Sequence, residues 1–406
     1  MQTKAKSHPI LRFLKPLFAI AVLAFVFKMM PWTDHLKWQS VEGEAIELEG
    51  EIVGDWKGST IQFLVAEDEV SDFAGDQVTA VRDMDVSMPG VEATIELGSA
   101  ASWDPGMGTV FRSVDPTWVA AGMALFFCAL LFGVTRWWRL LHLVGCEASW
   151  WNVLRLTYLG LFFNLVMPGL TGGDVAKAVL VVREHPERRA RALMSVVVDR
   201  IIGLATLALL ALVVVLITGE TFAEVRLPML AFFFAGVGGA LVYFNRHVRR
   251  LLRFDALLAK LPLGDKLATL DEAAQHYFAH PVELFFAMLL SLGNHASAIC
   301  AVWALGLSFG VTAGEVNLLE YFALVPIANI VSSIPIAPSG WGVGEAVYIY
   351  LFTLVGASAS LGVAVSVSFR LCQLLLGLLG GLFLLAPGAR AELDELETEV
   401  AEIENS

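Results

Sequence analysis

Residues 164–174 read Asn-Leu-Val-Met-Pro-Gly-Leu-Thr-Gly-Gly-Asp, and they end a long apolar segment before a short one, 175–182, begins. Residues 335–345 read Pro-Ile-Ala-Pro-Ser-Gly-Trp-Gly-Val-Gly-Glu and again precede a short apolar segment, 346–356. Proline and glycine interrupt helices, and a full membrane crossing takes about 20 residues. Each stretch therefore favours a re-entrant helical hairpin, although a plain loop between two ordinary helices is the alternative.

The rest of the chain has the composition of a polytopic α-helical membrane protein. Of its 406 residues, 57% are hydrophobic and 17% are charged, whereas soluble domains have about 45–50% and about 25%. The apolar excess lies in blocks long enough to cross a bilayer, such as 192–219, 282–310 and 359–387. A helical membrane domain is expected over 116–386.

The net charge of −13 combines regions of opposite sign. Residues 32–115 carry −14 and the tail 388–406 carries −6, which leaves +7 for the membrane body. Positive charge concentrates on the cytoplasmic side of membrane proteins. We therefore expect an acidic cytoplasmic tail at 387–406 and basic inner loops in the membrane body.

Basic clusters set the expected topology. Four cations precede the first apolar stretch, which favours an uncleaved signal-anchor helix at 1–30 over a cleaved signal peptide. Further clusters follow at 136–142, 183–191 and 246–253, and we expect all three inside. This arrangement predicts a multi-pass protein of the cytoplasmic (inner) membrane with both termini cytoplasmic.

Residues 31–115 are predicted to form a small all-β extracytoplasmic insert after the first helix. Apolar and polar residues alternate, as in 45–49 and 93–97, with Gly, Pro and Asp between such runs. This pattern predicts four to six strands. The chain has four cysteines and none lies in this region, so no disulfide is expected there. An extracytoplasmic partner of the acidic insert is possible.

The two hairpins align at an offset of 170 residues, with Asp174 and Glu345 matching to within one position. The identical pairs are Pro168 and Pro338, Gly172 and Gly342, Ala176 and Ala346, and Arg200 and Arg370. The basic loops place the two halves in opposite orientations. Two inverted-topology repeats with broken helices are typical of transporters, whose substrate sites lie near the bilayer midplane.

The repeat predicts a central anion site. Helix N-termini offer unpaired N–H groups to anions, and charges inside a membrane mark functional sites by default. The predicted substrate-binding residues are Asn164, Gly172, Gly173, Asp174, Lys177, Arg200, Gly342, Gly344, Glu345 and Arg370. The two acids could instead be first-turn helix caps, and Arg200 could snorkel to the surface.

The motif residues at 164–174, with Asp199-Arg200 and Gly203, resemble the first signature of the lysylphosphatidylglycerol synthase transmembrane-region family. The second stretch, with Arg370, resembles its second signature. The resemblance covers about 117–386 and implies a flippase-like protein that moves lipids across the bilayer. We expect no aminoacyltransferase domain like that of the namesake enzymes after the last helix, and we expect the acidic insert to be an addition to the family's pattern.

Three functions follow from these patterns. The first is translocation of an anionic phospholipid or a polyprenyl-phosphate lipid, with membrane lipids as partners. The alternatives are an intramembrane lipid-modifying enzyme and an envelope scaffold whose acidic domain binds a partner. Because the sequence lacks His-Glu-x-x-His, we expect no catalytic residues, no metal and no cofactor. No nucleic-acid partner is expected.

The expected topology can be tested by cysteine labelling. In a background without native cysteines, Ser71→Cys should react with an impermeant maleimide in intact cells, because it lies in the outer domain. Ser406→Cys should react only after permeabilisation. Reaction of Ser406→Cys in intact cells would contradict the topology.

Overall fold

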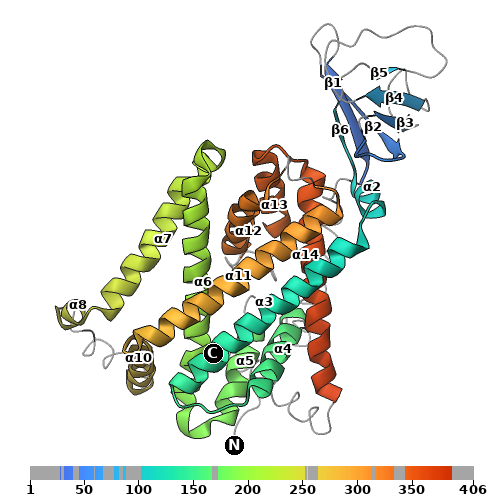
Figure 1. Cartoon of the computed structure of the whole chain (residues 1–406). Coiled ribbons are helices and arrows are strands. Elements are labelled where there is room, and N and C mark those ends of the chain that lie inside the picture. Colours follow the sequence, from blue (N-terminus) through green and yellow to red (C-terminus); the bar gives the residue numbers. More distant parts are fainter. Residues whose placement is uncertain are drawn as a thin grey trace, which may run out of the picture.

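The computed structural model describes residues 28, 32–39, 45–58, 60–66, 77–81, 86–87, 102–166, 172–251, 254, 264–311, 316–332 and 343–385. The predicted signal-anchor helix (apart from residue 28), the predicted hairpin tips with Gly342, and the predicted acidic tail lie outside these residues. The chain consists of a helical body with a small β-sheet beyond one end (Figure 1).

The sheet has six antiparallel strands, where the sequence predicted four to six. They are β1 (Asp34–Gln39), β2 (Ala45–Val53), β3 (Thr60–Val65), β4 (Gln77–Val81), β5 (Val86–Ser87) and β6 (Ser102–Asp104), in the order β5-β4-β3-β2-β1-β6. Alternate residues of the central strands are buried, among them Leu36, Leu48 and Phe63. The opposite face is acidic, and a hydrogen bond with Glu47 raises the pKa of Lys37 on that face.

One buried carboxylate fixes the base of the sheet. Asp34 accepts hydrogen bonds from the Ile52 amide at 2.6 Å, the Gly106 amide at 2.5 Å and the Thr109 hydroxyl at 2.8 Å. These donors come from β2 and from the start of α2 (Met107–Arg112). Asp34 therefore joins the first strands to the helix that leads into the membrane body.

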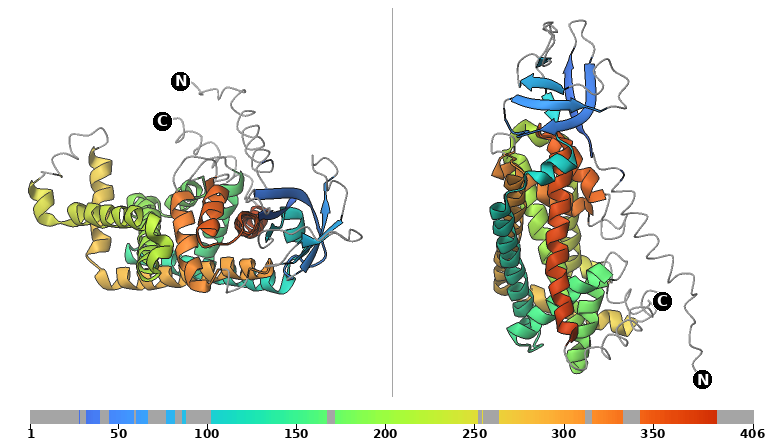
Figure 2. Two further views of the ribbon diagram at one scale, coloured as in Figure 1. Left: turned by 90° about the horizontal axis from the view of Figure 1, so that it is seen from above. Right: turned by 90° about the vertical axis from the view of Figure 1, so that its right-hand side faces the viewer.

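Tryptophans connect the sheet to the helices below it. The Trp103 indole donates to the Trp56 carbonyl at 2.8 Å, and the Trp56 indole donates to the Ser113 hydroxyl at 3.1 Å. Phe111 of α2 meets Phe309 edge-on, with ring centroids 5.5 Å apart. The buried apolar core is continuous from the sheet into the helical body, and the sheet lies over one end of that body (Figure 2).

The helical body contains long membrane-crossing helices and shorter paired ones. Its helices are α3 (Pro116–Leu143), α4 (Trp150–Val166), α5 (Gly172–Glu184), α6 (Arg189–Ile217), α7 (Ala223–Phe244), α8 (Arg246–Leu251), α10 (Gly264–Phe278), α11 (Pro281–Ser308), α12 (Leu318–Ser332), α13 (Val343–Leu354) and α14 (Ala359–Gly381). Within the described residues, five are long and apolar enough to cross a membrane: α3, α6, α7, α11 and α14. The protein is a multi-pass helical membrane protein.

Helices α3 and α11 form a long antiparallel pair. The Asp115 amide, at the start of α3, donates to the Ser308 carbonyl at 2.9 Å, and Arg139 near its end contacts Glu283 near the start of α11 at 2.7 Å. In the middle, the Asn294 amide donates to the Ala129 carbonyl at 2.6 Å. This pair lies along one face of the body (Figure 2).

The shorter helices occupy opposite halves of the body. Helices α4 and α5 lie in the half away from the sheet, and α12 and α13 lie in the half nearer to it (Figure 1). Helix α14 packs along α4, whereas α6 packs along α12. The connections 167–171 and 333–342 lie outside the described residues.

The prediction of a basic loop at 136–142 is wrong. Helix α3 continues to Leu143, and Arg136 is buried inside it. The cationic side chain suggested a helix end, but a partner on α6 compensates its charge and lets it stay in the protein interior. The predicted inner cluster at 246–253 likewise begins with a helix, α8, and α10 follows it.

Replacing Asp34 should loosen the sheet from α2. Asp34→Ala leaves three buried donors without an acceptor, at a cost of about 1–3 kcal/mol each. We expect the full chain in detergent to become protease-sensitive in the β domain at a lower temperature. Glu47→Ala, on the exposed face and paired, among the described residues, only with His35 and Lys37 within the sheet, is the control and should lose at most about 1 kcal/mol. Equal protease sensitivity of the two variants would contradict this role for Asp34.

Candidate functional site

The first half of the site begins where α4 and α5 approach each other. The Gly173 amide donates to the Asn164 side-chain oxygen at 2.7 Å, so Asn164 satisfies a free N–H at the start of α5. A β-carbon at Gly173 would collide with the Gly160 carbonyl and with Asn164. Glycine is therefore required at this contact. Gly172 is the first residue of α5.

Asp174 lies on the first turn of α5 and pairs with Arg200 of α6. The Arg200 Nε donates to Asp174 Oδ2 at 2.5 Å, and a second guanidinium nitrogen contacts the same oxygen. The Asp174 side chain is 26% exposed and that of Arg200 is 57% exposed. The pair lies at the protein surface.

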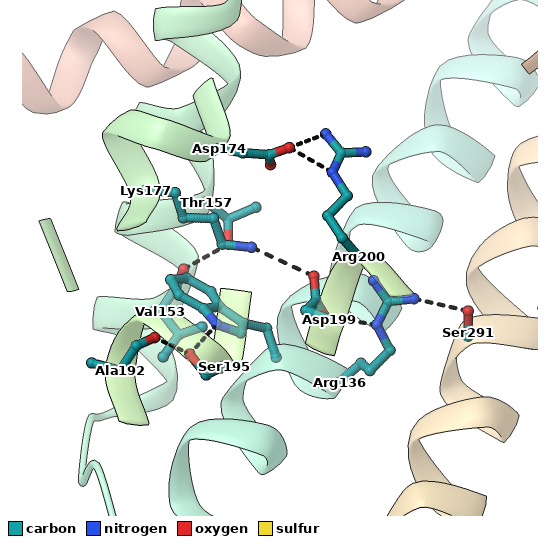
Figure 3. A network of polar contacts seen from close by, with 11 residues as sticks. Arg136, Val153, Thr157, Asp174, Lys177, Ala192, Ser195, Asp199, Arg200 and Ser291 are labelled. Atoms are coloured by element: carbon teal, nitrogen blue, oxygen red, sulfur yellow. Dashed lines mark hydrogen bonds and ion pairs between the residues drawn. The ribbon is translucent and has the colours of Figure 1, made fainter. Parts of the chain in front are cut away.

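Asp199, the residue before Arg200 on α6, is buried. Its Oδ1 accepts from Arg136 Nε of α3 at 2.7 Å, and another Arg136 nitrogen donates to the Ser291 hydroxyl of α11 at 2.8 Å (Figure 3). Its Oδ2 lies 3.7 Å from the Lys177 ammonium of α5. Asp199 therefore links α3, α5 and α6.

Lys177 is held mainly by an aromatic ring. Its ammonium lies 3.7 Å from the centre of the Trp137 ring, a cation–π contact. The Trp137 indole is itself fixed by a 3.1 Å hydrogen bond to the Ser195 hydroxyl. The 3.7 Å contact of Lys177 with Asp199 is longer than a hydrogen bond. Asp199 therefore compensates the charge of Lys177 without forming a close hydrogen bond to its ammonium group.

The second half has a corresponding ion pair. Arg370 Nε of α14 donates to Glu345 Oε1 of α13 at 2.5 Å. The Glu345 side chain is 7% exposed and that of Arg370 is 12% exposed. A β-carbon at Gly344 would collide with the Arg370 guanidinium, so glycine allows the arginine to cross the start of α13.

The structure joins eight of the ten predicted site residues in local sets. Asn164 with Gly173, Asp174 with Arg200, and Glu345 with Arg370 are in contact, Gly344 borders Arg370, and Lys177 lies beside Asp199. Gly172 opens α5, and Gly342 lies outside the described residues. Each ion pair forms within its own half. A single cavity shared by both arginines stays a prediction.

Sequence reasoning missed Arg136, Trp137 and Ser291 as parts of this network. A signal existed for Arg136, because Asp199 offered a carboxylate inside an apolar helix and needed a cation. The helix partner could not be chosen from the sequence alone. The histidine of α11, His295, contacts the Gly203 carbonyl at 2.9 Å, an interhelical hydrogen bond.

The sequence of this chain is similar to those of a known family of membrane proteins. A sequence model of the lysylphosphatidylglycerol synthase TM region matches residues 106–381. A UPF0104 membrane protein of Methanocaldococcus jannaschii is 22% identical over 284 residues, which cover 66% of this chain and 83% of that protein. A UPF0104 membrane protein of Pyrococcus horikoshii is 24% identical over 326 residues, or 73% and 91%. No solved structure matches this chain.

Arg136 should be important for stability. Arg136→Ala leaves Asp199 buried with only the distant Lys177, and breaking a buried pair costs about 3–5 kcal/mol. We expect a clear drop in the thermal denaturation temperature of the purified protein in detergent. Arg139→Ala, on the same helix but half-exposed with Glu283, should cost at most about 1 kcal/mol. Similar losses in the two variants would argue against the Asp199 network.

Proposed function

Since this chain belongs to the lysylphosphatidylglycerol synthase transmembrane-region family, we propose that it translocates an anionic lipid across the cytoplasmic membrane. The lipid is a phospholipid or a polyprenyl-phosphate lipid. It leaves chemically unchanged, so the proposal includes no catalytic residue. The termini are cytoplasmic and the sheet is outside.

The observation that carries the proposal is the matched pair of acid–arginine contacts. In each half a carboxylate on the first turn of a short helix holds an arginine of the following long helix. The partners are 26 residues apart in the first half and 25 in the second. Such a repeated arrangement supports two corresponding binding positions for one kind of ligand. We call these positions stations, one in each half.

We propose that α3–α6 and α11–α14 are inverted repeats with re-entrant hairpins at α4–α5 and α12–α13. Exchange of the two halves turns the α4–α14 contact into the α12–α6 contact, and both contacts exist. The same exchange maps the antiparallel α3–α11 pair onto itself. The hairpins in opposite halves of the body (Figure 1) also support this arrangement, which is typical of transporters.

The chemistry of the stations suits a phosphate headgroup. A charge left alone at mid-membrane costs at least about 3 kcal/mol on insertion scales. Arginine keeps its charge and presents planar donors that match phosphate oxygens. Asp174 and Glu345 compensate the arginines when no lipid is present, and an arriving phosphate can replace them.

Lipid movement can be measured in vesicles that contain phosphatidylglycerol with a dithionite-sensitive fluorophore. The parent protein should expose inner-leaflet label to the quencher. Arg200→Ala and Arg370→Ala should slow the quenching of inner-leaflet label by about tenfold or more. The reason is that loss of one charged hydrogen bond costs about 1.5–3 kcal/mol. Arg200→Lys should keep partial activity because it keeps the charge.

Arg155→Ala is the matched control. Arg155 forms an ion pair with Glu184 at 3.1 Å across the same α4–α5 hairpin, but near its other end. This variant should translocate lipid at the parent rate. Parent rates in both Arg200→Ala and Arg370→Ala would refute the proposed function, and production of free phosphate or a modified lipid would favour an enzyme.

A further inference from the structure

The two ion pairs differ in how far they are open to their surroundings. More than half of the Arg200 side chain is exposed, whereas Arg370 and Glu345 are almost fully buried. Pseudo-equivalent residues in one structure thus have unequal access. Only the first-half pair can be reached by a ligand without movement of the helices around it.

The surface around Arg200 is apolar. Val197, Ile201 and Leu204 of α6 are all exposed, one turn before Arg200, next to it and one turn after it. An exposed arginine surrounded by hydrocarbon-compatible side chains is unfavourable in a membrane unless its charge is compensated. A charged group bordered by an apolar stripe has the amphiphilic pattern of a lipid with its headgroup at mid-membrane depth.

The first half also carries a surplus positive charge. Its described network contains three cations, Arg136, Lys177 and Arg200, and two carboxylates, Asp174 and Asp199. Arg136 makes the close contact with Asp199, so Lys177 is not required to neutralise it. Lys177 lies one turn from Asp174 on the same side of α5 (Figure 3), and its long flexible stem allows the ammonium to move toward an anion.

We infer that Arg200, which is exposed in this structure, and Lys177 form a phosphate-binding position, with Val197, Ile201 and Leu204 receiving the acyl chains. The Lys177 side chain is only 12% exposed, so its ammonium moves outward to reach the phosphate. This assignment rests on the proposed function and specifies it. The lipid reaches the first half sideways from the bilayer. Its phosphate takes the place of Asp174 on Arg200 and uses the weakly bonded donors of Lys177. The Glu345–Arg370 pair is the closed counterpart and does not take part in this first binding step.

The test measures binding to the purified full chain in detergent, by calorimetry with short-chain dihexanoyl phosphatidylglycerol. Lys177→Met and Arg200→Gln should each weaken binding by about tenfold, the equivalent of about 1.4 kcal/mol. The control Arg155→Gln should bind within about twofold of the parent. Parent-level binding in Lys177→Met or in Arg200→Gln would overturn the assignment. If Lys177→Met does not fold, Lys177→Gln replaces it under the same criteria.

Two further experiments distinguish recognition of the phosphate headgroup from recognition of the acyl chains. Inorganic phosphate should compete with the lipid, because the phosphate is the group recognised, and a failure to compete at saturating phosphate would overturn that point. Ile201→Ser should weaken lipid binding while leaving phosphate binding unchanged. Leu216→Ser, at a similarly exposed position of α6, should change neither. Equal effects of the two serine variants would overturn the apolar component.

The outcomes also distinguish this inference from the proposed function. If the parent binds lipid with the expected pattern of variants but moves no lipid in vesicles, the binding position stands and translocation fails. If the parent moves lipid while Lys177→Met and Arg200→Gln bind it like the parent, translocation stands and the binding position fails.

Discussion

A charge placed inside the membrane must meet an opposite charge within the same protein, and the helical body is arranged around that requirement. Asp199 satisfies it for three helices at once, through Arg136 and Lys177. The acid and the lysine of α5, Asp174 and Lys177, both contact α6. Without those contacts, α5 would present two charged side chains to hydrocarbon.

The glycines of the two halves serve the same requirement in different ways. Gly173 lets two backbones approach, so that Asn164 can satisfy the start of α5. Gly344 instead leaves space for a guanidinium, so that Arg370 lies across the start of α13. In the first half, backbone contact fills the space beside Gly173, and Arg200 is exposed. In the second half, Arg370 itself fills the space beside Gly344 and is buried. The same sequence pattern thus produces two stations with different access.

Much of this architecture could be predicted from the sequence. Membrane helices and strands follow from local periodicity, and the Asp174–Arg200 and Glu345–Arg370 partners could be suspected because each lone charge in an apolar segment needs a counter-charge. Arg136 could not be placed, since an arginine near the end of an apolar run resembles a loop residue until its partner on another helix is known. The packing of Trp56 and Trp103 against the helical body depends on tertiary contacts that no local pattern encodes.

The strand order has a consequence for how such a protein could have arisen. Strands β1 and β6, the first and last of the sheet, are neighbours, with Leu36 paired to Trp103. The chain therefore enters and leaves the sheet at nearly one point, which is the geometry that tolerates insertion of a whole domain. A gene segment encoding the sheet could be gained or lost ahead of α3 without separating any two of the helices from α3 to α14. Removal of the sheet together with α2 would uncover Phe309 at the end of α11, which packs against Phe111 of α2, so a lineage without both elements would need a more polar residue there.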